Sequence, residues 1–385
     1  MTRRLALIAG LLSIIASACG TAAPTSGPAT YDVTVDASSP AFNLQVTAYF
    51  PNELKAHPGD TLKFTAIDRG EPHTVTFGTL VDAAVAKIPP GPPVPSLEPY
   101  GLPDLIGAPP QLPVSQAAAQ PCFLASGAPP KDACSKDQQK VIEFNGTQAF
   151  SNSGWLQPKQ EYSLKLADTI KPGVYSFICL LHANAMLGKI TVVDKGQATQ
   201  SAGDLKDAAA AQVKARVDAL QPAVDAANKA TADSAFAGVI SEKVPDAQAP
   251  IFAPKQLTIP VGGSVTWKVF GPHMIAFNAS ADLVGALAKA PEGTVAVNGK
   301  AFAPAGGPGA PPPPAGAAPP PPNAPPQTIP VVAPGWDGKG LHNSGFFLSF
   351  PPTFFSYKLT FTTAGTYPYK CLIHPDMEGT VKVGQ

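Results

Sequence analysis

The chain has 385 residues, which is enough for two ordinary domains. Apolar residues make up 44% of it, enough for buried cores, while charged residues make up only 14% and balance to a formal net charge of zero. This balance favours neither nucleic acid nor an anionic surface as a partner.

The first eighteen residues predict a targeting segment that exports the protein. Arg3 and Arg4 give a positive start, residues 5–15 are apolar, and Ala16-Ser-Ala18 is a small-residue exit before Cys19. A cysteine placed there resembles a bacterial lipobox, which would make Cys19 the lipid-modified mature N-terminus. The alternative is plain cleavage after Ala18 and a soluble secreted protein. We expect an extracytoplasmic location, in the periplasm or at the cell surface, with the lipid as the only membrane contact.

The rest of the chain repeats one pattern twice, and the repeat defines the predicted domains. Most segments alternate apolar and polar residues between Gly or Pro, which is typical of half-buried strands. Several short strands in this rhythm indicate β-sandwiches or barrels. We expect an all-β protein with one domain at residues 31–196 and a second at residues 235–385. Before them, residues 1–18 would be the signal peptide and residues 19–30 a tether.

Each predicted domain carries a Pro-rich insertion. Each lies between the upstream histidine and the cysteine loop. The first runs through Ile88 to Cys122 and Cys134, and the second includes proline runs at residues 311–314 and 319–322. Such tracts cannot pair as strands and should be extended like polyproline or disordered. They are either recognition arms near the functional loops or tolerated surface excursions.

Residues 197–234, between the two domains, predict a helical linker. Alanine enrichment and apolar residues three or four positions apart favour a helix. Pro222 should kink this helix or begin a second short one. We expect its apolar stripe to dock on a neighbouring domain.

Both copies gather residues that suit a soft, redox-active metal. Each places a cysteine, a histidine three residues later and a methionine in one short loop, with a lone histidine far upstream. The sets are His73, Cys179, His182 and Met186, and His273, Cys371, His374 and Met377. A Cys-His-His set with a weak axial Met suits both Cu(I) and Cu(II), so little reorganises when an electron moves. The loop alone would also allow zinc or a redox thiol, whereas the complete sets select copper.

The remaining three cysteines then have separate roles. Cys19 belongs to the predicted anchor, which leaves Cys122 and Cys134. These two lie close in sequence in an oxidising compartment, so a disulfide that staples a loop is expected. The alternative is a separate metal site, but no histidine or third cysteine lies near them in the sequence.

The whole pattern resembles a cupredoxin, the plastocyanin and amicyanin kind of small blue copper protein, present twice. The resemblance rests on the Gly-x-Tyr-x-aromatic-x-Cys-x-x-His segment, the Met-x-Gly that follows it and a final alternating strand. It covers both domains apart from their insertions. It implies two Greek-key β-sandwiches and two type 1 copper ions, each held by one of the two ligand sets. Thr74 and Met274 depart from the family, in which many members have a loop-bracing Asn after the upstream histidine.

The histidine count bears on catalysis. The two ligand sets use four of the six histidines, and we expect the other two, His57 and His342, at the surface. Multicopper oxidases need several His-x-His pairs, and two-domain copper nitrite reductases need a further three-histidine centre. The sequence has neither, so we expect an electron carrier and not an enzyme.

The leading hypothesis is therefore an exported protein that passes single electrons between redox partners, such as a cytochrome or a membrane oxidoreductase. Electrons would enter and leave at the edges of His182 and His374. Apolar neighbours such as Leu180 and Leu372 would ring these edges, or would simply pack inward. The alternative function is copper storage, delivery or tolerance. A third, a small reductase or oxidase, is disfavoured by the histidine count.

Overall fold

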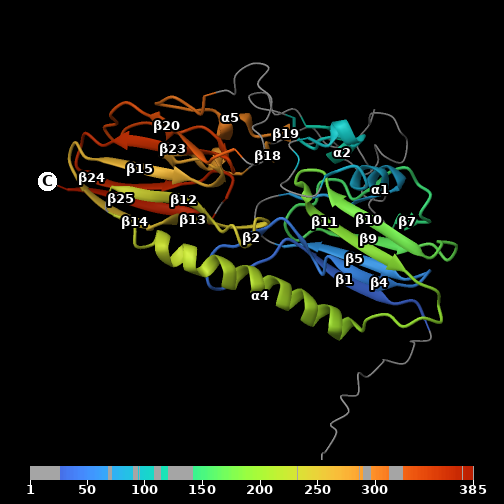
Figure 1. Cartoon of the computed structure of the whole chain (residues 1–385). Coiled ribbons are helices and arrows are strands. Elements are labelled where there is room, and N and C mark those ends of the chain that lie inside the picture. Colours follow the sequence, from blue (N-terminus) through green and yellow to red (C-terminus); the bar gives the residue numbers. More distant parts are fainter. Residues whose placement is uncertain are drawn as a thin grey trace, which may run out of the picture.

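In the computed structural model the chain forms two β-sandwiches and one long helix that runs along both (Figure 1). The structure describes residues 27–67, 72–89, 94, 96–107, 114–119, 142–231, 233–285, 287–288, 296–311, 324–374 and 376–384. The predicted signal peptide, Cys19, and the Cys122 and Cys134 pair lie outside the described residues. The predicted domain boundaries stay a prediction.

The first domain consists of two five-stranded sheets. Their strand orders are β3-β1-β5-β9-β7 and β4-β11-β10-β6-β8, and both mix parallel and antiparallel neighbours. The strands are β1 (Thr30–Val35), β3 (Tyr49–Phe50), β4 (Glu53–Ala56), β5 (Thr61–Ala66), β6 (Thr76–Phe77), β7 (Ile142–Phe144), β8 (Ser151–Asn152), β9 (Glu161–Leu166), β10 (Gly173–Cys179) and β11 (Ala183–Val192).

The second domain repeats this arrangement. Its main sheets have the orders β2-β13-β12-β15-β23-β20 and β14-β25-β24-β17-β21, and two small ribbons, β16-β22 and β18-β19, accompany them. The strands are β2 (Gln45–Val46), β12 (Ser234–Ile240), β13 (Ala247–Ala253), β14 (Gln256–Pro260), β15 (Ser264–Val269), β16 (Gly271–His273), β17 (Ala276–Phe277), β18 (Leu287–Ala288), β19 (Ala296–Val297), β20 (Gln327–Val332), β21 (His342–Asn343), β22 (Phe347–Ser349), β23 (Thr353–Thr360), β24 (Gly365–Lys370) and β25 (Glu378–Gly384).

The strands form because alternate residues can enter a shared core. In β5, Leu62, Phe64 and Ala66 are buried while the residues between them are half-buried. Aromatic rings fill each sandwich, with Phe64 against Phe177 in the first domain and Trp267 against Tyr369 in the second. The predicted all-β fold with two sandwiches is confirmed.

The linker helix α4 (Ala202–Ala227) begins with a capping box between Ser201 and Asp204. It runs unbroken through Pro222, so the alternative of a second short helix is wrong. Its apolar face packs on both domains, with Leu220 against the first-domain segment around Phe50 and Val224 against β12 and β13. The prediction that the stripe docks on a neighbouring domain holds, and it docks on two. Within the described part of the chain, no helix combines the length and the apolar character that crossing a membrane requires.

The first domain also contributes a strand to a sheet of the second. β2 belongs in sequence to the first domain, yet it pairs with β13 of the second through Val46 opposite Ala247 and Gln45 opposite Gln248. The Gln248 amide donates a buried hydrogen bond to Gln45, beside this pairing. The domains are therefore joined by backbone hydrogen bonds as well as by α4.

The described part of the first insertion folds inward, so the expectation of extended or disordered chain is wrong for these residues, while residues 90–93 of its proline tract lie outside the described residues. It forms α1 (Thr79–Val85), the short 3-10 helix η1 (Glu98–Tyr100) and α2 (Gln116–Ala119). Val81 and Leu97 pack there against Ile178 and Leu180 of the cysteine loop. Apolar residues between the prolines explain this, because they bury surface that an extended tract would expose. In the second insertion the structure describes η3 (Ala281–Leu283) and α5 (Gly299–Phe302), whereas its proline runs at residues 312–314 and 319–322 lie outside the described residues.

Candidate metal centres

The first centre lies where the end of one strand meets an upstream loop. Cys179 is the last residue of β10, His182 follows in the turn to β11, and His73 comes from the segment before β6. The Cys179 Sγ and the His182 Nδ1 are 3.5 Å apart. One ligand atom from each of the three residues lies within 4.8 Å of the others.

The second centre repeats this geometry in a deeper position. The Cys371 Sγ lies 3.4 Å from the His374 Nδ1 and 4.0 Å from the His273 Nδ1. The two histidine Nδ1 atoms are 3.1 Å apart. All three residues are buried, whereas His182 of the first centre is half-buried. The edge of His374 is therefore not at the surface, contrary to expectation.

The electrostatics of both centres favour a thiolate, which is the form that binds metal. Burial raises the pKa of the Cys179 thiol, but the neighbouring His182 and His73 lower it by more. The net result is a pKa well below the usual range of a thiol. The pKa of Cys371 is also lowered, because His374 and backbone N–H groups outweigh burial. Burial likewise lowers the pKa of the His73 imidazole, but Asp36 and Cys179 raise it to about 9.

The first cysteine loop is braced from three sides. The backbone N–H of Leu180 donates to the Thr74 hydroxyl at 2.8 Å, and the N–H of Thr74 approaches the Cys179 Sγ at 3.4 Å. From the insertion, the Val94 N–H donates to the Asn184 side chain. Thr74 thus braces the loop by its hydroxyl, at a position where the resemblance implied an Asn in many relatives.

The second loop is shorter and closes on itself. The Cys371 N–H donates to the Met377 carbonyl at 3.0 Å, and the Met377 N–H donates to the His374 carbonyl at 2.9 Å. Met274, next to the upstream histidine, is fully buried in the core of the domain. The two loops therefore reach the same Cys-His geometry by different bracing.

The two predicted axial residues lie in the same cores as the cysteines. Met186 is fully buried in the cluster that contains Cys179, and Met377 is fully buried in the one that contains Cys371. Their role as ligands stays a prediction. Leu180 and Leu372 are also buried, so the alternative in which they pack inward describes the structure.

Two residues outside the ligand sets differ from the sequence-based expectation. His342 is fully buried in β21, where its Nε2 lies 2.6 Å from the Tyr357 hydroxyl, so the surface position predicted for it is wrong. Asp36 was missed entirely. Its Oδ2 lies 3.6 Å from the Nε2 of His73, and both side chains are 2% exposed. The signal in the sequence that could have identified Asp36 is its place directly after an alternating strand, at the position that Gly238 occupies in the second copy.

The donor sets fit copper in the chemistry of their atoms. A thiol and two imidazoles converge in a buried, apolar setting, and a thioether side chain lies in each core. Soft sulfur with imidazole nitrogen is the combination that copper accepts in both oxidation states.

The chain is similar to several solved structures of copper proteins. No protein-family model and no curated protein matches the sequence. Among solved structures, the chain is similar to reduced auracyanin from Roseiflexus castenholzii, with 16% identity and a TM-score of 0.22, over 43% of this chain and 98% of that one. It is similar to the blue copper oxidase from Nitrosomonas europaea, with 8% identity and a TM-score of 0.19, over 92% and 86%. A third, titled multicopper oxidase mgLAC, has 11% identity and a TM-score of 0.20, over 93% and 86%.

The prediction that the protein is not an enzyme is wrong. Structures of blue copper and multicopper oxidases match this chain over more than nine-tenths of its length. The histidine count excluded only clusters of the kinds named above, built from this chain's own histidines. It says nothing about chemistry at mononuclear centres or in a larger assembly, so it cannot exclude catalysis.

Proposed function

We propose that this is an exported copper protein with two type 1 centres that passes single electrons between redox partners. The observation that carries the proposal is the pair of Cys-His-His sets, buried except for the half-buried His182, each with its ligand atoms within 4.8 Å of one another. One copper ion would be held by His73, Cys179 and His182, with Met186 as the axial ligand. The other would be held by His273, Cys371 and His374, with Met377 as the axial ligand. When bound there, the copper supplies one-electron redox chemistry.

The chain's own residues would keep the reorganisation small. Each cysteine is fixed at or directly after the end of a strand, and the second histidine comes three residues later on the same loop. The upstream histidine comes from a different segment, so the donor set is held by the sandwich before any metal binds. Burial also keeps water from the thiolates.

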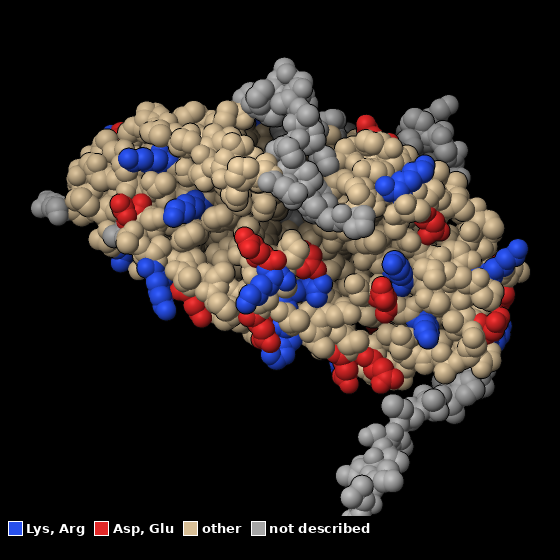
Figure 2. Space-filling model, viewed as in Figure 1, with Lys and Arg blue, Asp and Glu red and all other residues tan. Residues whose placement is uncertain are grey.

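The surface supports contact with partners that is not steered by charge. Figure 2 shows basic and acidic side chains of both signs scattered over the visible face, without a single-sign patch. The net charge of the chain is zero. Redox proteins such as a cytochrome or a membrane oxidoreductase are the proposed partners. An extracytoplasmic location, with lipidation at Cys19, completes the proposal.

Metal content and visible absorption test the proposal directly. We expect two coppers per chain and an intense blue colour near ~600 nm from Cu(II)–thiolate bonding. Cys179→Ser and Cys371→Ser should each remove about half of the colour and one copper. A colourless protein, or one whose colour survives both substitutions, would contradict the assignment. Oxygen consumption with one-electron donors should be measured on the same samples, to show whether the centres also serve an oxidase reaction.

A further inference from the structure

The two candidate centres differ in what faces the outer nitrogen of the upstream histidine. In the first domain β1 runs parallel to β5 and pairs Val35 with Ala66, and in the second β12 runs parallel to β15 and pairs Ala237 with Val269. The next residues are Asp36 and Gly238, which therefore occupy equivalent positions. Both have a left-handed backbone, with φ of 67° and 80°.

At this position the first domain holds a fixed carboxylate. One oxygen of Asp36, Oδ1, accepts hydrogen bonds from the N–H groups of Ala37 and Val46, at 2.5 and 2.7 Å. This fixes the other oxygen, Oδ2, 3.6 Å from the His73 Nε2. A carboxylate behind a ligand imidazole fixes the orientation of the ring and makes it a more basic ligand.

The second domain cannot hold a side chain there. A Cβ added to Gly238 would collide with the Nε2 of His273 and with the carbonyl oxygen of Phe270. The positive φ also favours glycine at this place. The first domain thus has the Asp36 carboxylate beside the Nε2 of His73, whereas the second has Gly238, without a side chain, beside the Nε2 of His273.

Taking the two copper centres of the proposed function as given, we propose that Asp36 is a positioning residue that gives the first centre a lower reduction potential than the second. A buried negative charge near a metal site stabilises the more positive oxidation state. The low effective dielectric around two side chains that are 2% exposed strengthens this effect. Electrons therefore run from the first centre to the second.

A redox titration of the copper-loaded full chain tests this. Cys371→Ser isolates the first centre and Cys179→Ser the second, and the first should titrate at the lower potential. Adding Asp36→Asn to Cys371→Ser should shift the ratio of Cu(II) to Cu(I) at least tenfold toward Cu(I), a rise of about 59 mV for one electron.

Asp60→Asn is the matched control, because Asp60 is also a buried carboxylate but binds the N–H groups of Ala29 and His57. It should leave the potential unchanged. An Asp36→Asn shift of zero or of opposite sign, or a first centre that titrates above the second, overturns the inference. If Asp36→Asn does not fold, the order of the two potentials still decides. Complete loss of the blue colour in each single cysteine variant, where half should remain, would instead refute the two independent centres of the proposed function.

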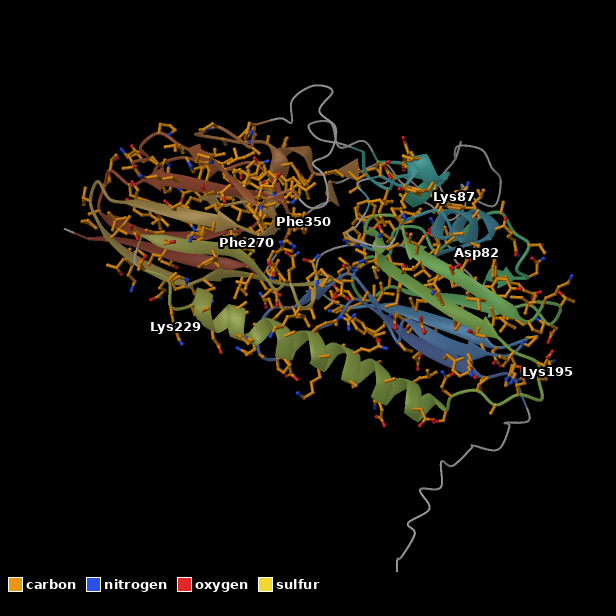
Figure 3. All side chains as sticks on the ribbon, in the orientation of Figure 1. Asp82, Lys87, Lys195, Lys229, Phe270 and Phe350 are labelled. Atoms are coloured by element: carbon orange, nitrogen blue, oxygen red, sulfur yellow. The ribbon has the colours of Figure 1, made fainter. Side chains whose placement is uncertain are left out.

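A separate observation concerns how electrons reach the second centre. His374 is only 4% exposed, and a small crevice beside it is lined by Asn43, Leu44 and Gln45 of the first domain. The Asn43 side chain donates to the Asp376 carbonyl at 3.0 Å, in the same loop. Figure 3 shows Phe270, which precedes the His273 strand, and Phe350 at the end of the second domain that faces the first.

The connection between the domains continues toward the first centre. Val46, next to Gln45, donates its N–H to Asp36, which faces His73. On the other side, Gln45 binds Gln248, whose side-chain oxygen lies close to Gly271 in the His273 strand. We infer that the second centre exchanges electrons through the first domain, by way of residues 36–46, and not directly with an external partner.

Stopped-flow reduction with reduced cytochrome c tests this route. In the loaded full chain, bleaching of the second centre should follow that of the first at a rate independent of cytochrome concentration. Cys179→Ser should slow reduction of the second centre at least tenfold, while Cys371→Ser leaves that of the first centre unchanged. A second phase that rises linearly with cytochrome concentration, or a second centre that is equally fast in Cys179→Ser, overturns the inference without touching the copper assignment.

Discussion

Burial of His342 predicts a loss of stability in mildly acidic solution. The ring lies inside the second domain, with Trp336 5.6 Å away between centroids and Tyr357 as its hydrogen-bonding partner. Burial lowers the pKa of His342 from 6.5 to about 4. Because the unfolded chain takes up this proton first, folding stability falls as the pH drops from about 6.5 toward 4.

The size of the effect follows from the two pKa values. One pKa unit corresponds to about 1.4 kcal/mol, so the difference amounts to roughly 3 kcal/mol when fully expressed. Between pH 7 and pH 5, where only the unfolded state is protonated, about 2 kcal/mol of this is lost. The change is large against a typical domain stability of about 5–15 kcal/mol.

Denaturant unfolding at pH 7 and pH 5 measures this loss, followed by tryptophan fluorescence. His342→Gln can still bond to the Tyr357 hydroxyl but does not titrate, so its stability should fall about 2 kcal/mol less than that of the wild type over this range. His57→Gln is the control, because His57 is partly exposed on a turn, and it should behave as the wild type. An equal pH loss in the wild type and His342→Gln would refute the reasoning.

Three further substitutions test the bracing of the structure. Thr74→Val removes the acceptor of a buried N–H at the first cysteine loop, so the free energy of unfolding of the copper-loaded protein should fall by about 1–3 kcal/mol. An unchanged melting temperature would contradict this. Gly188→Ala would drive a methyl group into the Phe177 ring and should destabilise by about 1–3 kcal/mol in denaturant unfolding, whereas Gly196→Ala, in open space, should not. Arg216→Ala removes the ion pair of α4 with Asp246 and should speed proteolysis between the domains, unlike Lys214→Ala on the exposed face.

The fold could be predicted because its signals are local. Alternation within strands such as β5 and the repetition of whole motifs do not depend on tertiary contacts. The cysteine and the histidine that follows it are three residues apart, so the sequence alone predicts that their side chains lie close together. The upstream histidines were found only because the chain holds two copies, each with a lone histidine in a similar setting.

The remaining features depend on contacts that no local pattern encodes. Asp36 reads as an ordinary strand-ending residue until β1 is placed beside the His73 segment. His342 occupies the place of a serine in the first copy, and its burial follows from the rings around it. The buried edge of His374 depends on the first-domain segment at residues 43–45.

The contribution of β2 to the second domain's sheet has a consequence for how the repeat can be divided. Without the first domain, β13 would become the edge of its sheet and expose unpaired backbone groups at Ala247 and Gln248. Open edges of this kind template pairing with other chains. A second repeat cut out at residue 235 would expose β13 as an edge strand able to pair with other chains, whereas in the intact protein β2 covers this edge. The two copies are thus halves of one object, and a gene that encoded only the second would encode a protein prone to self-association.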